Sequence, residues 1–411
     1  MANTILTIDM ITREAIRLWK NTNSFIQHID TQYDDSFAKT GAKIGTSLRI
    51  RLPNDFTVRT GAAASVQDTT ETNTTLTLAT QKGVDISFSS LERAMRLDDF
   101  SKRILAPMVN VLVGAVAADV MSGAEAGSSQ FTGNINASGV LGNPTAATWL
   151  SAGAILDNAS APRGNRKIVM DPMTQARTVS SLSGLLNPSK KIGEQYESGE
   201  IMQALGFDWM ADQTVIKHTA GAYTGSGSPA TVVTTVNGAS QTGLTLTVNA
   251  ITGTLNKGDV ITIAGVSSVN RITKQSNGDL ATFVVTANVA NGGTSISIYP
   301  AIVPPSGGNP VQYQTVTASP ANSANVYVNV LASTVVRKNL AYVPEAVTMA
   351  TADLELPRGV HEAAREQYDG VSMRMISAYN VSTDQFITRL DVLYGYLWIR
   401  PEWVVTVGDA L

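Results

Sequence analysis

The sequence predicts an α+β fold that is interrupted by an inserted all-β barrel domain. Between Thr219 and Pro320 only five residues are charged, and short strand patterns alternate with turns rich in Gly, Asn and Pro. Helical and strand patterns precede this segment, and they resume after residue 325. Turn-rich stretches such as "AGAYTGSGSPA" and "SPANSA" flank it, as expected at the borders of an insertion. The spacing of its strands fits a small antiparallel barrel or a sandwich, and we expect this inserted domain to span residues 219–325.

Five strands are expected inside the insert. The segment "NKGDVITIAGV" is typical of them, with a turn at Gly258, a strand in which Ile261 and Ile263 share one face, and a second turn at Gly265. Similar patterns place the strands near residues 244–249, 258–264, 281–289, 294–299 and 311–318.

The first segment, residues 1–45, is expected to form an arm with an amphipathic helix over residues 8–29. One helical face is apolar, and another carries a basic stripe of Arg13, Arg17 and Lys20. This stripe is either a solvated helix face or a docking surface for a partner chain, and the residues leave both interpretations open.

Residues 46–89 predict a long hairpin. "SLRIRLP" alternates apolar and basic residues, and its expected partner is the alternating segment "TTLTLATQKGVDISFS". An isolated hairpin is marginally stable in water, so we expect this one to rest on another surface, such as a neighbouring subunit. Its candidate contacts with a subunit or a scaffold are Arg49, Arg51, Arg59, Asp68 and Glu71.

Residues 90–144 contain the longest predicted helix, over residues 98–122. Asp98 or Asp99 can cap its start, and Gly123 can end it. Pro107 is expected to kink this helix or to mark a second start. Its apolar run is broken by polar residues and barely long enough to span a bilayer, so we interpret it as a buried helix rather than a membrane span.

The segment 145–218 alternates helix and strand, and residues 326–411 continue the same α+β character. We expect a helix over 146–158, a strand over 167–171, and a helix over 172–186 that starts at Asp171-Pro172.

Composition excludes several classes of function. The formal charge is −3 and the pI is near 5.7, which argues against a dedicated nucleic-acid binder. The absence of cysteine excludes disulfides, thiolate metal sites and cysteine nucleophiles, and it fits a reducing cytoplasm. The start "MANTILTIDM" lacks a basic region, so no secretory signal is expected.

No catalytic, cofactor or metal site is expected. "HEAAR" begins like a zinc-protease helix, but Arg365 stands where the second histidine must be. "GSGSPA" follows no clear strand and opens no helix, so it cannot present helix amides to a pyrophosphate. We therefore expect a protein that is not an enzyme.

The strongest family signal lies near the end of the chain. "DQFITRLDVLYGYLWIRPEWVVTV", with "AYVPEAVTMATADLELP", resembles the C-terminal half of major capsid proteins of short-tailed phages of the Salmonella podovirus type. "KGDVITIAGV" resembles a strand-turn signature of the barrel that this group carries. The resemblance implies the HK97-like capsid fold, with the following parts: N-terminal arm (1–45), E-loop hairpin (46–89), peripheral domain with spine helix (90–144), first part of the axial domain (145–218), inserted β-barrel (219–325), and second part of the axial and peripheral domains (326–411).

The resemblance also implies a function. It predicts a major capsid protein that self-assembles as hexamers and pentamers, with a scaffolding protein and a portal, into the icosahedral shell that encloses phage DNA. Contact with the packaged double-stranded DNA should be weak and non-specific, no membrane is involved, and assembly occurs in the bacterial cytoplasm. The chain lacks a long helical region before the arm, so neither crosslinking nor N-terminal processing is expected. Two alternatives remain: a phage tail or adhesin-type binding protein whose β module recognises a target, and an enzyme with an unrecognised site.

Overall fold

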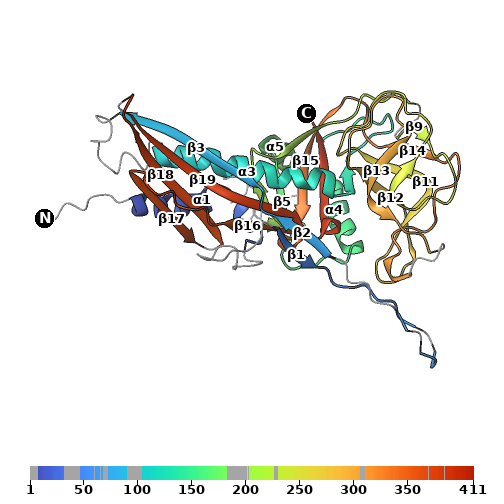
Figure 1. Cartoon of the computed structure of the whole chain (residues 1–411). Coiled ribbons are helices and arrows are strands. Elements are labelled where there is room, and N and C mark those ends of the chain that lie inside the picture. Colours follow the sequence, from blue (N-terminus) through green and yellow to red (C-terminus); the bar gives the residue numbers. More distant parts are fainter. Residues whose placement is uncertain are drawn as a thin grey trace. The chain divides into compact units, whose positions relative to one another are not determined.

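A computed structural model describes residues 8–31, 47–59, 61–64, 66–67, 73–89, 104–182, 201, 203–225, 230–305, 311–368, 370–383 and 385–411 (Figure 1). The chain forms two compact units. The first comprises Met1–Arg51, Asn73–Val120 and Val347–Ile399, and the second comprises Leu52–Thr72, Met121–Ala346 and Arg400–Leu411.

The first unit is built on an antiparallel five-stranded sheet. Its strands are β16 (Val347–Ala352), β19 (Gln385–Trp398), β18 (Val371–Asn380) and β17 (Glu362–Tyr368), in that order. The fifth strand, β3 (Thr80–Ser89), also pairs with β19, along residues 385–394. Figure 1 shows β3 lying along β19. The helix α1 (Ile8–Thr22) buries Ala15, Ile16 and Trp19, and a short 3₁₀ turn, η1 (Ile26–His28), follows it. The predicted helix over 8–29 is therefore broken after Thr22.

The hairpin differs from the expected one. β1 (Ser47–Arg51) pairs with β2 (Asn73–Thr77), but β3 pairs with β19 instead of extending this ribbon. Moreover, Ile50 and Leu76 are buried in a small core with Ala350 of the same chain. The hairpin therefore rests on another surface, as expected, but at its base that surface belongs to the same chain and not to a neighbouring subunit, since apolar alternation predicts a buried face without saying what buries it.

The longest helix, α3 (Ala106–Gly127), begins and ends later than expected. Pro107 is the second residue of α3, which directly follows a π-helical turn at residues 104–105, so it stands where the α-helix begins and not in its middle. Gly123 lies inside the helix, and Asp98 and Asp99 lie outside the described residues. Among the described helices, α3 alone is long and apolar enough to cross a bilayer, but the buried core helix of a soluble protein passes the same test. Leu112, Val113 and Val116 are buried in this way.

The sheet of the second unit has seven strands. The order is β4 (Gln130–Gly133), β20 (Val404–Ala410), β15 (Val335–Tyr342), β5 (Lys167–Met170), β7 (Phe207–Ala211) and β6 (Gln203–Ala204), and β8 (Ile216–Thr219) pairs with the first half of β15. The helices are α4 (Ala146–Asn158) and α5 (Pro172–Leu182), and two 3₁₀ turns, η5 (Pro344–Ala346) and η6 (Pro401–Trp403), flank the strands.

Several local predictions are confirmed in this unit. α4 has the predicted bounds because Thr145 caps its first turn, accepting a hydrogen bond from the amide of Thr148. α5 starts at Pro172 as predicted, since Asp171 accepts a hydrogen bond from the amide of Met173. The core packs Trp149 edge-on against Trp209, with ring centroids 4.9 Å apart.

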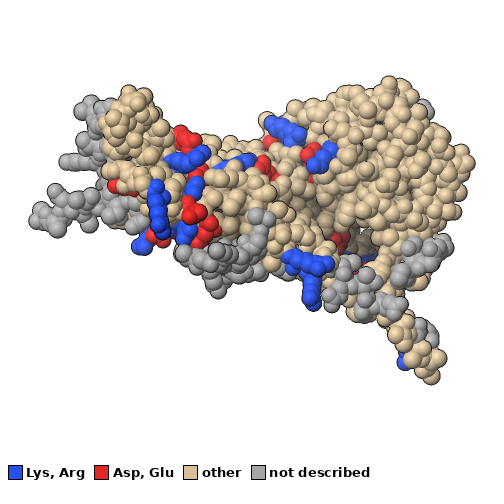
Figure 2. All heavy atoms as spheres, viewed as in Figure 1, with Lys and Arg blue, Asp and Glu red and all other residues tan. Residues whose placement is uncertain are grey.

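The insert is a closed barrel, as the family resemblance implied, but it has six strands and not five. Its strands run in the order β10 (Gly243–Thr247), β13 (Ser295–Ile302), β12 (Ser276–Val285), β11 (Val260–Val269), β14 (Asn325–Val328) and β9 (Thr231–Thr235). A bridge between Val236 and Val248 joins the two ends of this series, so the strands curl into the barrel visible in yellow and orange in Figure 1. Phe283, Ile261 and Ile298 belong to its apolar interior. Almost no charged side chain lies on the visible face of the barrel (Figure 2).

Three details of the barrel differ from expectation. β9 and β14 are both additional strands, and β14 extends to Val328, past the boundary expected at residue 325. The strand expected over 311–318 is absent, and a 3₁₀ turn, η4 (Val311–Tyr313), begins this segment. Here Gln312, Gln314 and Val316 are buried, the side-chain amide of Gln314 donates to the backbone carbonyl of Val316, and only an isolated bridge joins Val316 to Ser268.

The barrel leaves and rejoins the sheet at neighbouring positions. Thr219 at the end of β8 pairs with Val335 at the start of β15. Beyond this pair, the amide of Ala220 donates to the carbonyl of Thr334 at 2.9 Å, and the amide of Ser333 donates to the carbonyl of Gly221 at 3.0 Å. The insert therefore occupies the place of a turn between two antiparallel strands.

Candidate functional site

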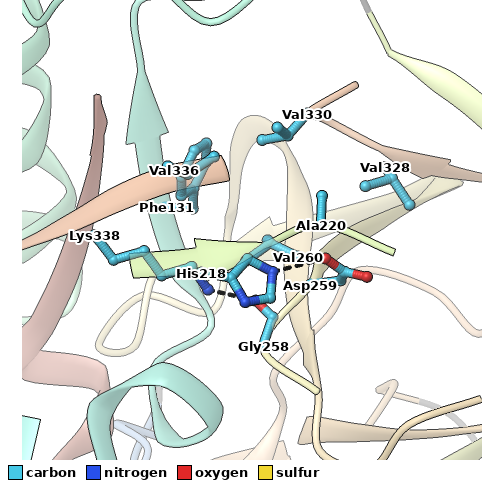
Figure 3. Close-up of a pocket in the computed structure, with 10 residues that line it drawn as sticks. All are labelled: Phe131, His218, Ala220, Gly258, Asp259, Val260, Val328, Val330, Val336 and Lys338. Atoms are coloured by element: carbon cyan, nitrogen blue, oxygen red, sulfur yellow. Dashed lines mark hydrogen bonds and ion pairs between the residues drawn. The ribbon is translucent and has the colours of Figure 1, made fainter. Parts of the chain in front are cut away.

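A buried cluster of charged side chains joins the barrel to the sheet of the second unit. Its centre is His218 on β8, which is 6% exposed. The imidazole Nδ1 lies 2.6 Å from Oε1 of Glu125, in the last turn of α3, and Nε2 lies 2.8 Å from Oδ1 of Asp259, which precedes β11. Figure 3 shows His218 directed at Asp259. We call Glu125, His218, Asp259 and Lys338 the junction cluster.

The imidazole of His218 is placed to carry a positive charge. Burial favours the neutral ring, but the hydrogen bonds with Asp259 and Glu125 outweigh burial and raise the pKa of His218 above its usual 6.5. Burial raises the pKa of Glu125, yet the His218 hydrogen bond and the charge of Lys338 together hold that pKa below 4.5. Both shifts favour an ion pair over a neutral pair.

The turn before β11 is fixed by the same cluster. Oδ2 of Asp259 accepts hydrogen bonds from the amide of Asn256 at 2.7 Å and from the amide of Gly221 at 3.1 Å. Gly258 has a φ of +98°, and a Cβ at this position would lie 2.7 Å from Cγ of Glu125. Only glycine therefore fits both the backbone conformation and the space.

Lys338 on β15 completes the cluster. Its Nζ donates a 2.5 Å hydrogen bond to the carbonyl of Gly258, as drawn in Figure 3. Burial lowers the pKa of Lys338 to about 8, although the carboxylates of Glu125 and Asp259 act in the opposite direction. When His218 is protonated, the cluster holds two anions and two cations, so its charges balance without a bound ion.

The cavity beside the cluster is too small for a ligand. Its volume is about 20 Å³, which suffices for one water molecule. Apart from the cluster its lining is mainly apolar, formed by Phe131, Ala220, Val260, Val328, Val330 and Val336 (Figure 3). Across the described residues, no group of three or more His, Asp or Glu side chains is arranged to hold a metal ion. The arrangement is suited to holding two parts of the chain together.

A second ion network also ties the barrel to host segments. Arg271, in the loop after β11, approaches Oδ1 of Asp55 with Nε at 3.2 Å and Nη2 at 3.0 Å. Its Nη1 donates to Oε1 of Glu402 at 2.6 Å. Because these side chains are only 29% exposed, solvent screens the pairs less than it screens ordinary surface pairs.

The sequence did not single out this cluster. Its members come from four elements that are far apart along the chain, and "NKGD" was interpreted only as a turn. One signal was present: in a charge-poor insert, Lys257 and Asp259 stand on either side of Gly258 in that turn.

The predicted contact residues of the arm are on the surface but have partners within the chain. Nε of Arg13 donates to Glu366 at 3.0 Å, and Arg17 forms a 2.6 Å ion pair with Glu14, one turn away on α1. The side chain of Lys20 lies outside the described residues.

The predicted contacts of the hairpin do not form one site. Arg49 and Arg51 are exposed on β1, on the opposite side from buried Ile50. Arg59 donates to the carbonyl of Gly61. Asp68 and Glu71 lie outside the described residues.

These parts define a class of protein. A hairpin joined to a sheet by its base, a long helix and a sheet interrupted by a closed barrel are the expected parts of an HK97-like phage capsid subunit. A family model described as "P22 coat protein - gene protein 5" matches residues 27–408. The chain therefore belongs to the P22 coat protein family: it is a phage major capsid protein, it forms the shell, and it resides in the virion capsid. This assignment replaces the tail or adhesin alternative, and the family is structural rather than enzymatic.

Solved structures of phage capsids are similar to this chain. A protein of Mycobacterium phage Che8 is 12% identical, over 93% of this chain and 90% of that one, with a TM-score of 0.47. A structure described as the asymmetric unit of bacteriophage PhiM1 mature capsid is 9% identical, over 88% and 82% of the two chains, with a TM-score of 0.40. The CUS-3 coat protein I-domain is 33% identical, over 24% of this chain and 96% of that one, with a TM-score of 0.20. A search of curated proteins gave no match.

Proposed function

We propose that this shell protein assembles as hexamers and pentamers, with a scaffolding protein and around a portal, and that the shell touches its DNA only weakly. The family supports an oligomeric shell. The formal charge of −3 supports weak contact with DNA, since tight binding of phosphates needs clustered Lys and Arg. We further propose that the six segments expected from the sequence, from the arm at 1–45 to the closing segment at 326–411, are the working parts of the subunit.

The observation that supports subunit contacts best is the two-sided hairpin base. Ile50 on β1 is buried within the subunit, whereas Arg49 and Arg51 point away from that core and are exposed. One face thus anchors the hairpin, and the other exposes two cations that an acidic surface of another copy would attract. We propose Arg49 and Arg51 as contacts between subunits, and Arg13, Arg17 and Lys20 as contacts with a neighbour or scaffold.

The test compares assembly with folding. In the variant Arg49→Gln/Arg51→Gln, the subunit should unfold at the same urea concentration as the wild type, because both side chains are exposed. Shell yield, measured by sedimentation and negative-stain electron microscopy in the presence of scaffolding protein, should fall. Arg163→Gln is the matched control, since Arg163 is 79% exposed on a loop outside the hairpin.

Unchanged shells from the double variant would remove these arginines from the proposal. Full-length protein that stays monomeric with its scaffolding protein would refute the scaffold-assisted assembly. For the DNA contact, we expect little salt dependence when free subunits are mixed with duplex DNA, and a steep dependence would contradict weak binding.

A further inference from the structure

The junction cluster holds three elements with a single side chain. His218 on β8 bonds Glu125 at the end of α3 through Nδ1, and it bonds Asp259 in the turn of the barrel through Nε2. Asp259 in turn accepts the amides of Asn256 and Gly221, so the turn and the start of the insert depend on its position. Removing His218 from this position would therefore release the barrel turn and the helix end together.

The geometry sets the number of protons that the site needs. Each carboxylate oxygen is an acceptor, so both ring nitrogens of His218 must donate to satisfy the two contacts. A neutral imidazole has one N–H, and its other nitrogen would face a carboxylate with a lone pair at 2.6 or 2.8 Å. The two hydrogen bonds can coexist with both carboxylates ionised only when the ring is charged.

No other described group is placed to supply the missing donor. Nζ of Lys338 donates to the carbonyl of Gly258, and the hydroxyl of Tyr223 donates to the carbonyl of Val330. Burial and the charge of Asp259 raise the pKa of Tyr223, so its hydroxyl keeps its proton. Lys257 acts on Glu125 through its charge, and Lys217, the neighbour of His218 on β8, is exposed.

We propose that His218 is a protonation-dependent latch that holds the barrel turn 256–259 and the last turn of α3 to strand β8. The latch is closed while the imidazole is charged and opens as the ring loses its proton. Because one ring serves both carboxylates, the barrel turn and the helix end respond to pH as one unit.

The direction of the pH effect follows from proton binding. The folded protein holds the His218 proton more tightly than an unfolded chain, so the stabilisation is complete below pH 6.5 and is lost as pH rises through the folded pKa. Between pH 6.5 and 7, Lys338 is still mostly charged because its pKa is about 8, so His218 governs most of the change in the lower part of this window. Each pH unit can raise the opening equilibrium by at most about tenfold.

The test is amide hydrogen exchange on assembled shells of the full-length protein. Protection factors, corrected for the intrinsic pH dependence of exchange, should fall by up to about tenfold per pH unit between pH 6.5 and 8. The informative peptides contain the amides of Gly221 and Asn256, which donate to Asp259, and the amide of Ser128, which donates to Ala124 at the end of α3.

The decisive variant is Glu125→Gln. Its side-chain amide can donate to a neutral imidazole that itself donates to Asp259, so both hydrogen bonds survive without a charged ring. The variant should therefore stay protected across the window. His361→Gln is the matched control, because His361 lies in the other unit with its side chain 47% exposed, and it should behave as the wild type.

Two results would overturn the latch. In one, the protection factors of the wild type do not change with pH, and in the other, those of Glu125→Gln fall with pH as steeply as those of the wild type. If Glu125→Gln does not assemble, exchange at the imidazole C2 carbon of wild-type shells, read by mass spectrometry, decides. A titration midpoint of His218 above 6.5 supports the latch, and a midpoint at or below 6.5 overturns it.

Discussion

Substituting Gly258 should reveal how tightly the barrel turn packs against α3. In Gly258→Ala the backbone must keep a φ of +98°, which costs a residue with a Cβ about 1–2 kcal/mol. The new Cβ would also lie 2.7 Å from Cγ of Glu125, and overpacking of this kind costs about 1–3 kcal/mol more. We expect a total loss of about 2–5 kcal/mol in the free energy of unfolding of the barrel and its junction.

Gly265→Ala is a closely matched control. Gly265 has a φ of +75°, but nothing lies within 4 Å of an added Cβ, so only the backbone term applies. We would measure urea unfolding of the full-length subunit, with hydrogen exchange of barrel peptides as the readout. The free energies of unfolding of the two variants should differ by the cost of overpacking. Adding Glu125→Ala removes Cγ and should relieve the overpacking in Gly258→Ala. The double variant should therefore lose less unfolding free energy than the two single variants lose in sum. Equal losses for Gly258→Ala and Gly265→Ala would refute the packing argument.

Three further predictions concern the second unit. Ile261→Asp puts a carboxylate into the barrel core and should abolish soluble folding of the subunit, whereas Ile261→Val should cost about 0.5–1.5 kcal/mol in the free energy of unfolding. Soluble yield and urea unfolding measure both effects, and normal shells from the aspartate variant would contradict the burial argument. Arg271→Gln should weaken the attachment of the segments around Asp55 and Glu402 by about 1–2 kcal/mol, and Arg271→Lys should restore only part of this loss. Amide hydrogen exchange of the peptides that flank Asp55 and Glu402 measures the effect. Full recovery by lysine would show that the forked guanidinium of arginine is not needed. As the pH rises from 8 to 10.5, the free energy of unfolding of the wild type should increase relative to that of Lys338→Met, by up to about 3 kcal/mol. The reason is that folded Lys338 has released a proton that the unfolded chain still holds. Parallel plots of unfolding free energy against pH for the two proteins would exclude this.

Local signals in the sequence were sufficient for much of the fold. A capping threonine and an Asp-Pro start set the beginnings of α4 and α5, because these interactions involve residues within one helical turn. The insert was recognisable as an all-β domain from its strands, its turns and its lack of charge, but its closure into a barrel depends on the pairing of Val236 with Val248.

Pairing between distant segments was not predictable from these signals. The alternation in Thr80–Ser89 identifies a strand, but an alternating strand fits many partners, and its partner proved to be β19. In the same way, nothing near His218 in the sequence points to Glu125 or Asp259, because the fold alone brings them together. The contacts that the hairpin tip makes in a shell depend on other copies of the chain, and they stay predictions.

The pairing of β8 with β15 makes the sheet dependent on the insert during folding. Thr219 and Val335 are bonded neighbours, yet 115 residues separate them along the chain, as follows from their numbers. If the insert were unfolded, joining these strands would require closure of a loop of that length, whereas a folded barrel presents its two ends side by side. On loop-closure scaling, closing a flexible loop of that length costs about 4 kcal/mol, and a folded barrel removes most of this cost. The order of events follows from that entropy: the barrel should fold first, and β15, the strand that pairs with β20, β5 and β8, should join the sheet afterwards.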